Sequence, residues 1–349
     1  MHVLGRGDGE GPVGHLGHYR ARDGSAGADV RFDVDRPHAM LVVGKRGYGK
    51  SHTLGVVAEE CTATPGVTPV VVDPVGSLCG LGQVGTVVGR PTVRADAIPP
   101  RAWPALVGLD PRAPAGTVVW QAASATGTLA GIRGYVDDSE ADDTARRGAT
   151  NHLRLAASWE VFDPEGLDAR RLVSEPLTVL DCSALAPGAR DAVMYATASG
   201  LYEARVRGML DTLPWLLVDE AHVAFDGVTK SALETILTRG RAPGVSLVCA
   251  TQRPGALPAV ALSQSDLVVS HRLTASADVD ALTRCQATYV DGTLRERLPT
   301  GRGEALVVDD RTESVHVVRV RERETPHRGA SPRASRLTTD IDDGGGRDR

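Results

Sequence analysis

Residues 44–51 contain three glycines, two lysines and one serine. They run Gly44-Lys45-Arg46-Gly47-Tyr48-Gly49-Lys50-Ser51 and match the pattern G-x-x-x-x-G-K-S. An apolar run precedes them at residues 39–43, and a helix is expected from Ser51 to Glu60. Between a strand and a helix, such a loop points backbone N–H groups and the positive helix N-terminus at a polyphosphate. The flanks disfavour the alternative of a chance match in a glycine-rich turn, so the sequence predicts binding of a nucleoside triphosphate.

The positions of this loop have separate expected parts in holding ATP and Mg²⁺. Lys50 would contact the β- and γ-phosphates, and the Ser51 hydroxyl would be a ligand of Mg²⁺. The residues expected to form the phosphate cradle are Gly44, Gly47, Tyr48, Gly49, Lys50, Ser51 and His52.

Two adjacent acids follow a second apolar run. Residues 213–218 have the pattern of a buried strand and lead into Asp219 and Glu220. Successive residues of a strand point to opposite faces, so only one acid would face the cradle from within the strand. Asp219 is expected to hold Mg²⁺ through water, and Glu220 to orient and deprotonate the attacking water. A solvated acidic turn is the alternative, but the apolar run before the pair disfavours it, and hydrolysis is predicted.

The composition restricts the class of protein. The chain has 349 residues, 42% of them hydrophobic, enough for one large α/β domain with insertions or for two domains. No apolar run has the length of a membrane span and the N-terminus lacks a signal-peptide pattern, so a cytoplasmic protein without membrane contact is expected. With 4% aromatic residues and a net charge of −5, any contact with nucleic acid would depend on local charge. The cysteines lack a C-x-x-C pair and predict reduced thiols and no zinc site: Cys61, Cys79, Cys182, Cys249 and Cys285.

Short β-branched runs alternate with helical patterns along most of the chain. Strands are expected near residues 30–34, 39–43, 68–73, 177–181, 213–218, 245–252 and 266–272. Helices are expected near residues 51–60, 188–207, 229–239 and 277–283. This alternation predicts an α/β fold with a mostly parallel sheet that is covered on both faces.

The alternation is interrupted after the second core strand. Residues 84–176 are expected to form a helical insertion, with helices near 127–135 and 143–161. The acidic run at residues 137–143 could be a metal site, but a solvated loop with a helix-capping acid is favoured.

These patterns divide the chain into five parts. The expected parts are a short N-terminal β extension (1–37), an ATPase core (38–83 and 177–300), the helical insertion (84–176), a C-terminal β-hairpin packed on the core (301–324) and a disordered tail (325–349).

The order of the motifs resembles the HerA/FtsK superfamily of ring-forming DNA translocases, and the HerA branch in particular. Besides the glycine loop, the matching elements are Asp73-Pro74-Val75-Gly76, Asp219-Glu220-Ala221-His222, Arg239-Gly240-Arg241, Ala250-Thr251-Gln252-Arg253-Pro254, Leu262-Ser263-Gln264 and Gly303-Glu304-Ala305. The resemblance implies a RecA-like P-loop NTPase core. One departure is that HerA proteins usually carry a β-barrel ahead of this core, where this chain has only residues 1–37.

The resemblance and the chemistry of the side chains assign further roles near the nucleotide. The family's D-P-x-G element places Asp73 near the nucleotide. Gln252 ends a strand beside the acid-tipped strand, where an amide can sense the γ-phosphate. Arg241 is placed to supply a cation to the transition state, a contribution worth roughly 10³–10⁵ in rate in related chemistry.

A second departure concerns the cation that reaches across the subunit boundary. The family has an arginine twelve residues before the loop lysine, where this chain has His38. Either Arg36 replaces that arginine or the contact between subunits differs. Arg241 and Arg272 are the other candidates for this contact, and Arg241 could instead act within its own chain.

Three functions are compatible with these observations. The resemblance favours an ATP-driven motor, a ring homo-oligomer (a hexamer) that moves along double-stranded DNA and works with a nuclease partner. A conjugation or secretion ATPase is the second reading, although such proteins usually carry membrane spans. A slow nucleotide-dependent switch or scaffold is the third, and the negative net charge favours it somewhat.

Overall fold

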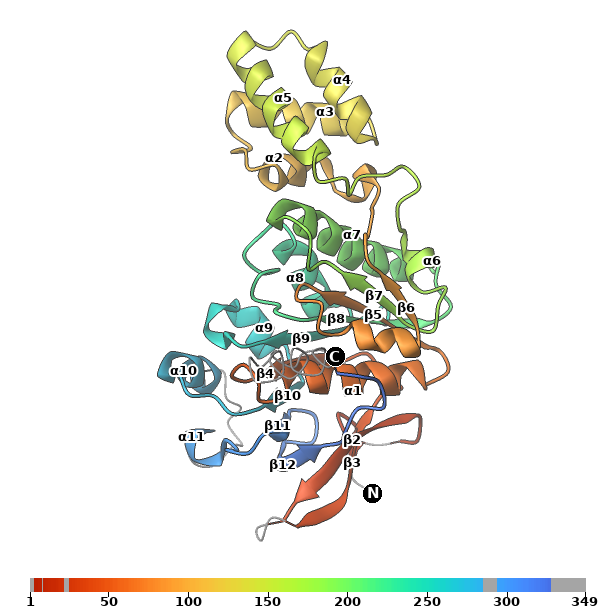
Figure 1. Cartoon of the computed structure of the whole chain (residues 1–349), viewed down its shortest axis with the longest axis vertical. Coiled ribbons are helices and arrows are strands. Elements are labelled where there is room, and N and C mark those ends of the chain that lie inside the picture. Colours follow the sequence, from red (N-terminus) through yellow and green to blue (C-terminus); the bar gives the residue numbers. More distant parts are fainter. Residues whose placement is uncertain (1–2, 8, 22–24, 285–293, 328–349) are drawn as a thin grey trace, which may run out of the picture.

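The computed structural model describes residues 3–7, 9–21, 25–284 and 294–327. These residues form one twelve-stranded sheet in the order β1-β3-β2-β12-β11-β10-β4-β9-β8-β5-β7-β6. The seven strands from β10 to β6 are mutually parallel, and β11, β12, β2 and β3 continue the sheet in antiparallel fashion. The fold is α/β and RecA-like, as the sequence predicts (Figure 1).

The strands are β1 (Val3–Leu4), β2 (Val13–Arg20), β3 (Ala26–Asp33), β4 (Ala39–Val43), β5 (Val67–Asp73), β6 (Thr86–Val88), β7 (Thr178–Asp181), β8 (Leu213–Val218), β9 (Ser246–Thr251), β10 (Leu267–Ser270), β11 (Glu304–Asp309) and β12 (Ser314–Val320). The helices are α1 (Lys50–Thr62), α2 (Trp103–Leu106), α3 (Pro114–Ala125), α4 (Leu129–Asp137), α5 (Asp143–Ala157), α6 (Ala169–Leu172), α7 (Pro187–Val206), α8 (Lys230–Arg239), α9 (Ala259–Ser263), α10 (Ser276–Arg284) and α11 (Leu294–Arg297).

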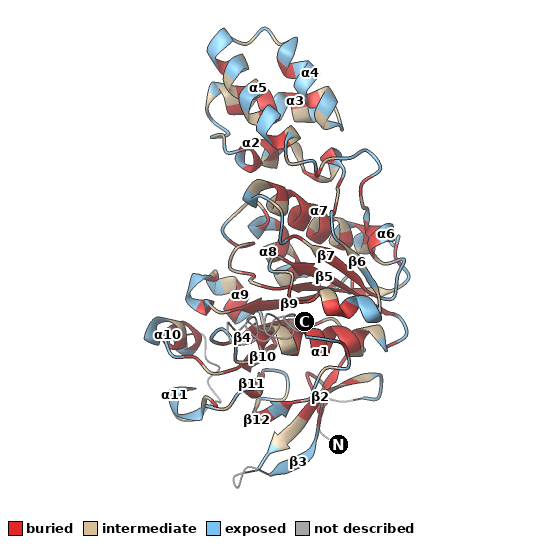
Figure 2. Ribbon diagram, in the orientation of Figure 1, coloured by how far each residue is buried: buried red, intermediate tan, exposed pale blue. Residues whose placement is uncertain are grey.

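Apolar side chains on both faces of the parallel strands produce a layered core. One face packs against α1, through residues such as Leu54 and Val57. The other packs against α7 and α8, through residues such as Val193 and Ile236. Figure 2 shows the central strands as the most continuously buried part of the chain. Strands buried on both faces carry almost only apolar residues, which is why their sequence pattern is so clear.

Three strands were not predicted: the two-residue β1, β2 and β6. Strand β2 contains two glycines and two histidines, so it lacks the apolar alternation of a half-buried strand. Strand β6 has three residues and lies at the edge of the sheet, within the stretch assigned to the helical insertion. The hairpin expected after residue 301 is β11 and β12, and it joins the sheet beside β10.

The stretch between β6 and β7 carries a lobe of helices that stands above the sheet in Figure 1. The acidic run caps a helix, because Asp142 Oδ1 accepts the N–H groups of Thr144 and Ala145 at 3.0 Å each. Helix α4 agrees with the prediction and α5 ends earlier than expected. Helix α3 was not predicted, since its glycine, threonine, serine and valines have low helix propensity.

The chain after β12 is fixed to helix α1 by a buried ion-pair network. Glu59 contacts Arg321 at 2.8 Å and Arg323 at 3.7 Å, and it accepts the N–H of Thr325 at 2.9 Å. Thr325 is only 4% exposed. The predicted disordered tail is therefore wrong for residues 325–327, because a carboxylate on α1 pairs with polar groups that look unstructured in the sequence. Residues 328–349 of that tail lie outside the described residues.

Within the described part of the chain, no helix is both long enough and apolar enough to cross a membrane. Cys61, Cys182 and Cys249 are free thiols, the Cys79 thiol donates to Asp181 at 3.5 Å, and Cys285 lies outside the described residues.

Candidate active site

The glycine-rich loop joins β4 to α1 and has a backbone that requires glycine. Gly47 and Gly49 have φ angles of +81° and +124°, values that side chains other than glycine rarely adopt. A Cβ at Gly49 would also lie 2.9 Å from the His271 ring. His271 was not predicted, yet it supports the loop: its Nε2 accepts from the Thr53 hydroxyl and its Nδ1 donates to the Glu304 carbonyl, both at 2.8 Å. Burial lowers its pKa to about 4, which keeps the ring neutral for these bonds.

The first residues of α1 meet the end of β8 at a pair of oxygen ligands. The Ser51 hydroxyl donates to Asp219 Oδ2 at 2.8 Å. Burial raises the pKa of Asp219 to about 6, and the Ser51 hydrogen bond opposes that rise. A hydroxyl and a carboxylate are oxygen ligands of the kind that Mg²⁺ prefers. These two residues therefore fit the predicted Mg²⁺ site, with an ionised Asp219 at neutral pH.

Glu220 has a backbone conformation that sets it apart from the strand before it. Its φ angle is +46°, and its N–H donates to Asp219 Oδ1 at 2.9 Å. Its Oε2 is buried and accepts no hydrogen bond from the described residues. Although His222 Nδ1 lies 3.3 Å away, that nitrogen is engaged with the Thr251 hydroxyl at 3.1 Å. A strained residue that leaves a buried carboxylate oxygen without a donor marks a functional site.

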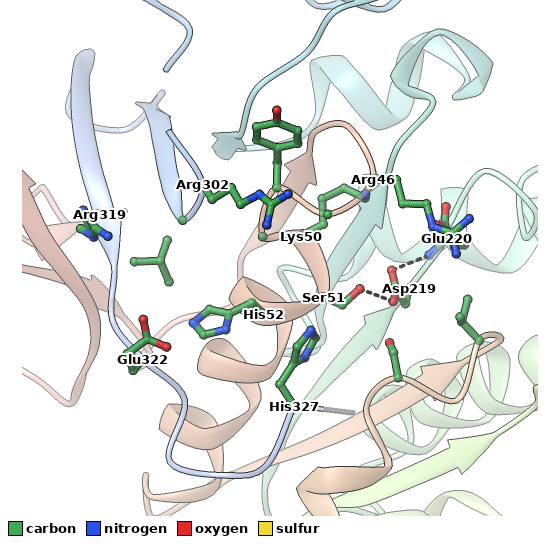
Figure 3. A pocket seen from close by; sticks show the side chains of 17 residues that line it. Arg46, Lys50, Ser51, His52, Asp219, Glu220, Arg302, Arg319, Glu322 and His327 are labelled. Atoms are coloured by element: carbon green, nitrogen blue, oxygen red, sulfur yellow. Dashed lines mark hydrogen bonds between the residues drawn. The ribbon is translucent and has the colours of Figure 1, made fainter. Parts of the chain in front are cut away.

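These groups border a cavity of about 440 Å³. Its lining includes the loop residues 46–52 together with Asp219 and Glu220, and Figure 3 shows Ser51 joined to Asp219 by a hydrogen bond. Lys50 is only 6% exposed. Burial lowers the pKa of its ammonium group, and the charges of Glu220 and Asp219 counteract this. The Lys50 ammonium, the Ser51 hydroxyl and the carboxylates of the acid pair thus all border this cavity.

The opposite wall of the cavity comes from the C-terminal elements, which the sequence analysis did not include in the site. It is formed by Arg302, Gly303, Arg319, Val320, Glu322 and His327. His52 joins the two walls, because its Nε2 donates to the Arg321 carbonyl at 2.7 Å. The only sequence signal for this wall is the Gly303-Glu304-Ala305 element.

Asp73 and Gln252 lie near the cavity but outside its lining. Asp73 accepts the N–H groups of Val75, Gly76 and Leu78 at 3.0, 2.8 and 2.6 Å. Its carboxylate thus shapes the turn after β5, and its contact with the nucleotide stays a prediction. Gln252 directly follows β9, which lies between β4 and β8 in the sheet. That position suits a sensor between the loop strand and the acid-tipped strand.

Arg241 lies at the other end of the parallel strands. It borders a second cavity with Pro37 and Ala39 at the amino end of β4, and its Nη2 lies 3.4 Å from Asp266. The five residues of β4 put about 16 Å between this end and the glycine loop. Arg241 therefore cannot act on the cavity of its own chain, which corrects that alternative. Arg36 precedes β4 at the same end of the sheet.

His38 is buried between two carboxylates and does not reach the surface. Its Nδ1 lies 3.0 Å from Asp266 and its Nε2 lies 3.7 Å from Asp33. Although burial opposes the charge, the hydrogen bond to Asp266 and the negative charges of both carboxylates raise the pKa of His38 to about 9. His38 stands where the HerA pattern has an arginine that reaches the neighbouring subunit. In this chain the residue at that position is a buried cation instead.

We expect stability to fall in alkaline solution because of His38. Its folded pKa of about 9 exceeds the usual 6.5, so its stabilisation is complete below pH 6.5 and is lost as pH rises through 9. Urea unfolding should show the free energy of unfolding falling by about 2 kcal/mol between pH 7 and 9. The His38→Gln variant should be less stable at pH 7 and lose less over this interval. An equal loss in both proteins would contradict the assignment.

Arg272 contacts the glycine loop of its own chain. Its guanidinium lies 5.4 Å from the centroid of the Tyr48 ring and donates to the Tyr48 hydroxyl at 3.3 Å. Its backbone carbonyl accepts the N–H of Lys45 at 2.7 Å. Arg272 thus supports the loop in cis, and the structure gives no contact that favours it as the residue reaching a neighbouring subunit.

Comparison with known proteins gives matches in structure only. No family model matches the chain, and no curated protein matches it significantly. A structure of VirB4 of Thermoanaerobacter pseudethanolicus is similar with a TM-score of 0.71 and 17% identity, covering 92% of this chain and 99% of that one. The bacterial conjugative coupling protein TrwB, as TrwBdeltaN70, is similar with a TM-score of 0.58 and 15% identity, covering 84% and 87%. At these identities the likeness establishes the fold.

Proposed function

We propose that this chain is an ATP-hydrolysing motor of the HerA/FtsK type. The observation that carries the proposal is the convergence of Lys50, Ser51, Asp219 and Glu220 on one cavity at the carboxyl end of the parallel strands. The RecA-like fold and the order of the sequence motifs support it.

In this proposal each of these residues has a step in hydrolysis, which its position at the cavity supports. Backbone N–H groups of the loop and the Lys50 ammonium hold the phosphates, and Mg²⁺ at Ser51 and Asp219 would offset their charge. Glu220 orients a water molecule and accepts its proton as the water oxygen bonds to the γ-phosphorus. The bond from that phosphorus to the ADP oxygen breaks at the same stage. The buried Oε2 of Glu220, which has no hydrogen-bond donor among the described residues, is suited to receive this proton.

A neighbouring subunit would complete the site. Arg241 is the best-placed trans cation, because its side chain is 73% exposed and, among the described residues, a single carboxylate forms an ion pair with it, at 3.4 Å. It lies at the amino end of the parallel strands, whereas the glycine loop lies at their carboxyl end. In a head-to-tail ring, the amino ends of these strands in one chain would face the cavity of the next chain. The family resemblance implies six subunits. Arg36 lies at the same end of the strands and is the second candidate for the trans cation.

Mixing inactive variants tests this arrangement. Arg241→Ala and Glu220→Gln proteins should each be inactive alone, whereas mixed rings should regain ATP hydrolysis. The reason is that some interfaces then join an intact Glu220 site to an intact Arg241. Arg239→Ala serves as the control, since Arg239 is an exposed arginine two residues earlier, and it should stay active alone. If every mixing ratio remains inactive although the subunits co-assemble, Arg241 does not act in trans.

Double-stranded DNA is the substrate that we propose for the motor, and a nuclease is the partner. Both proposals rest on the resemblance to the HerA/FtsK superfamily. With a net charge of −5, DNA would be held by local positive charge on loops facing the centre of the ring.

A conjugation or secretion ATPase is the second candidate, and one observation favours it. The similarity to the VirB4 structure covers 92% of this chain. The uncovered remainder is much shorter than the stretch 84–176, so the similarity includes much of the helical lobe as well as the core. Sedimentation with lipid vesicles that carry the membrane components of a secretion channel would support this candidate. Stimulation by DNA alone, without binding to such vesicles, would support the DNA-processing motor.

A further inference from the structure

A cluster of metal-ligating side chains lies on the N-terminal hairpin, apart from the nucleotide cavity. His18 Nδ1 lies 3.2 Å from Asp29 Oδ1, and His15 Nε2 lies 3.9 Å from the same oxygen. The three ligand atoms all lie within 4.8 Å of one another. Two imidazoles therefore flank a single carboxylate oxygen, as an ion held between them would require.

An irregularity in the strand brings the two histidines together. In a regular strand, residues three apart point to opposite faces. The pairing of β2 with β3 shifts register between His15 and Gly17, so His15 pairs with Arg31 while His18 pairs with Asp29. The extra residue of this bulge lets both imidazoles share the face of Asp29, while Leu16 stays buried in the core.

The bulge is fixed by side chains from other elements. The N–H of His15 donates to Glu60 Oε2 at 2.9 Å, and the carbonyl of His15 accepts from Arg321 Nε at 3.1 Å. Arg321 also pairs with Glu60 at 2.7 Å. Both backbone groups of His15 are thus held from helix α1 and the C-terminal segment, which presents the imidazole on a rigid base.

The remaining groups around the cluster are compatible with an ion. Arg31 approaches Asp29 at Oδ2, 3.8 Å away, and leaves Oδ1 facing the histidines. His15 Nε2 donates to the Gly17 carbonyl at 2.9 Å, so ion binding requires this nitrogen to lose its proton and the imidazole to turn away from the carbonyl. The side chains are 34%, 41% and 50% exposed for His15, His18 and Asp29. The site is therefore open to solvent and can exchange its ion.

We propose that His15, His18 and Asp29 form a binding site for a divalent transition metal of the Zn²⁺ type. Imidazole nitrogens favour Zn²⁺, Ni²⁺ or Cu²⁺ over Mg²⁺ and Ca²⁺, which prefer oxygen ligands. Three protein ligands leave a fourth position for water or for another molecule. The ion would clamp β2 to β3 beside helix α1. Cysteine spacing could not reveal such a site, because it contains no cysteine.

Metal titration of the tag-free, EDTA-treated protein tests the proposal. Calorimetry with Zn²⁺ in excess Mg²⁺, which occupies oxygen-ligand sites such as Ser51 and Asp219, should show one saturable equivalent. His18→Ala and Asp29→Asn should each weaken this binding by at least about tenfold. Losing a residue that only hydrogen-bonds to a metal ligand already lowers metal affinity by about 10- to 100-fold. The melting temperature of the wild type should rise with Zn²⁺, and that of the variants should not.

His316→Ala is the matched control. His316 lies on β12 against the Tyr19 ring, with ring centroids 5.2 Å apart, and is not one of the three proposed ligands. This variant should bind Zn²⁺ as the wild type does. The proposal is wrong if the wild type and a folded His15→Ala/His18→Ala double variant bind the same amount of Zn²⁺ with the same affinity, or if the wild type binds none.

Discussion

Replacing Glu220 by glutamine is expected to leave ATP binding intact and to slow hydrolysis by about 10²–10⁴-fold, the usual contribution of a positioned general base. The amide keeps the shape of the side chain but cannot accept the proton of the attacking water. Glu220 has a φ angle of +46° and a buried Oε2 that no described residue donates to, so its carboxylate is available to accept that proton. Single-turnover hydrolysis of radiolabelled ATP, with binding of a fluorescent ATP analogue measured in parallel, separates the two effects.

Glu322→Gln is the matched control for this experiment. Glu322 is an exposed carboxylate on the opposite wall of the same cavity, so its loss should change the rate by no more than about twofold, as for most surface substitutions. If Glu220→Gln hydrolyses ATP at the wild-type rate, another group is the base and the roles proposed for the acid pair are wrong.

Lys50→Ala is expected to abolish turnover and to remove most of the affinity for ATP. Lys50 is the buried cation of the glycine loop, and it lies close enough to Glu220 and Asp219 for their charges to act on its pKa. Without it, the β- and γ-phosphates would face two carboxylates with no compensating side-chain charge from the loop's buried positions. Titration with a fluorescent ATP analogue measures the loss of affinity directly.

Lys45→Ala makes the same substitution in the same loop. The Lys45 side chain is exposed, and the bond from this residue to Arg272 uses its backbone N–H, which alanine keeps. Affinity should therefore stay within about twofold of the wild type. Binding by Lys50→Ala that is equally close to wild type would show that the glycine loop does not hold the phosphates.

The parts of the site that are contiguous in sequence could be predicted from it. Gly44 to Ser51 lies between a buried strand and a helix, so its local pattern determines both its shape and its place in the sheet. Asp219 was predicted in the same way, because the apolar strand before it is parallel to the loop strand and ends on the same side of the sheet, one strand away. Its hydrogen bond to Ser51 confirms that the two segments meet.

The parts that depend on tertiary contacts could not be predicted. Asp73 holds three backbone N–H groups of its own turn, and no pattern distinguishes this from a contact with a ligand. Arg241 follows a helix, but only the arrangement of the sheet shows that this helix ends at the amino ends of the strands, away from the glycine loop. Thr325 has a partner 266 residues away in sequence, and composition alone makes its segment look disordered.

The rate of ATP hydrolysis with and without duplex DNA, measured together with the particle mass in ATP, tests the proposed motor most directly. We predict a ring with a mass of several 36.7 kDa chains, six if the family resemblance holds, and a rate that duplex DNA raises severalfold, with Glu220→Gln as the background. A monomeric mass, with a slow rate that is proportional to protein concentration and unaffected by DNA, would contradict the motor. The chain would then be a nucleotide-dependent switch.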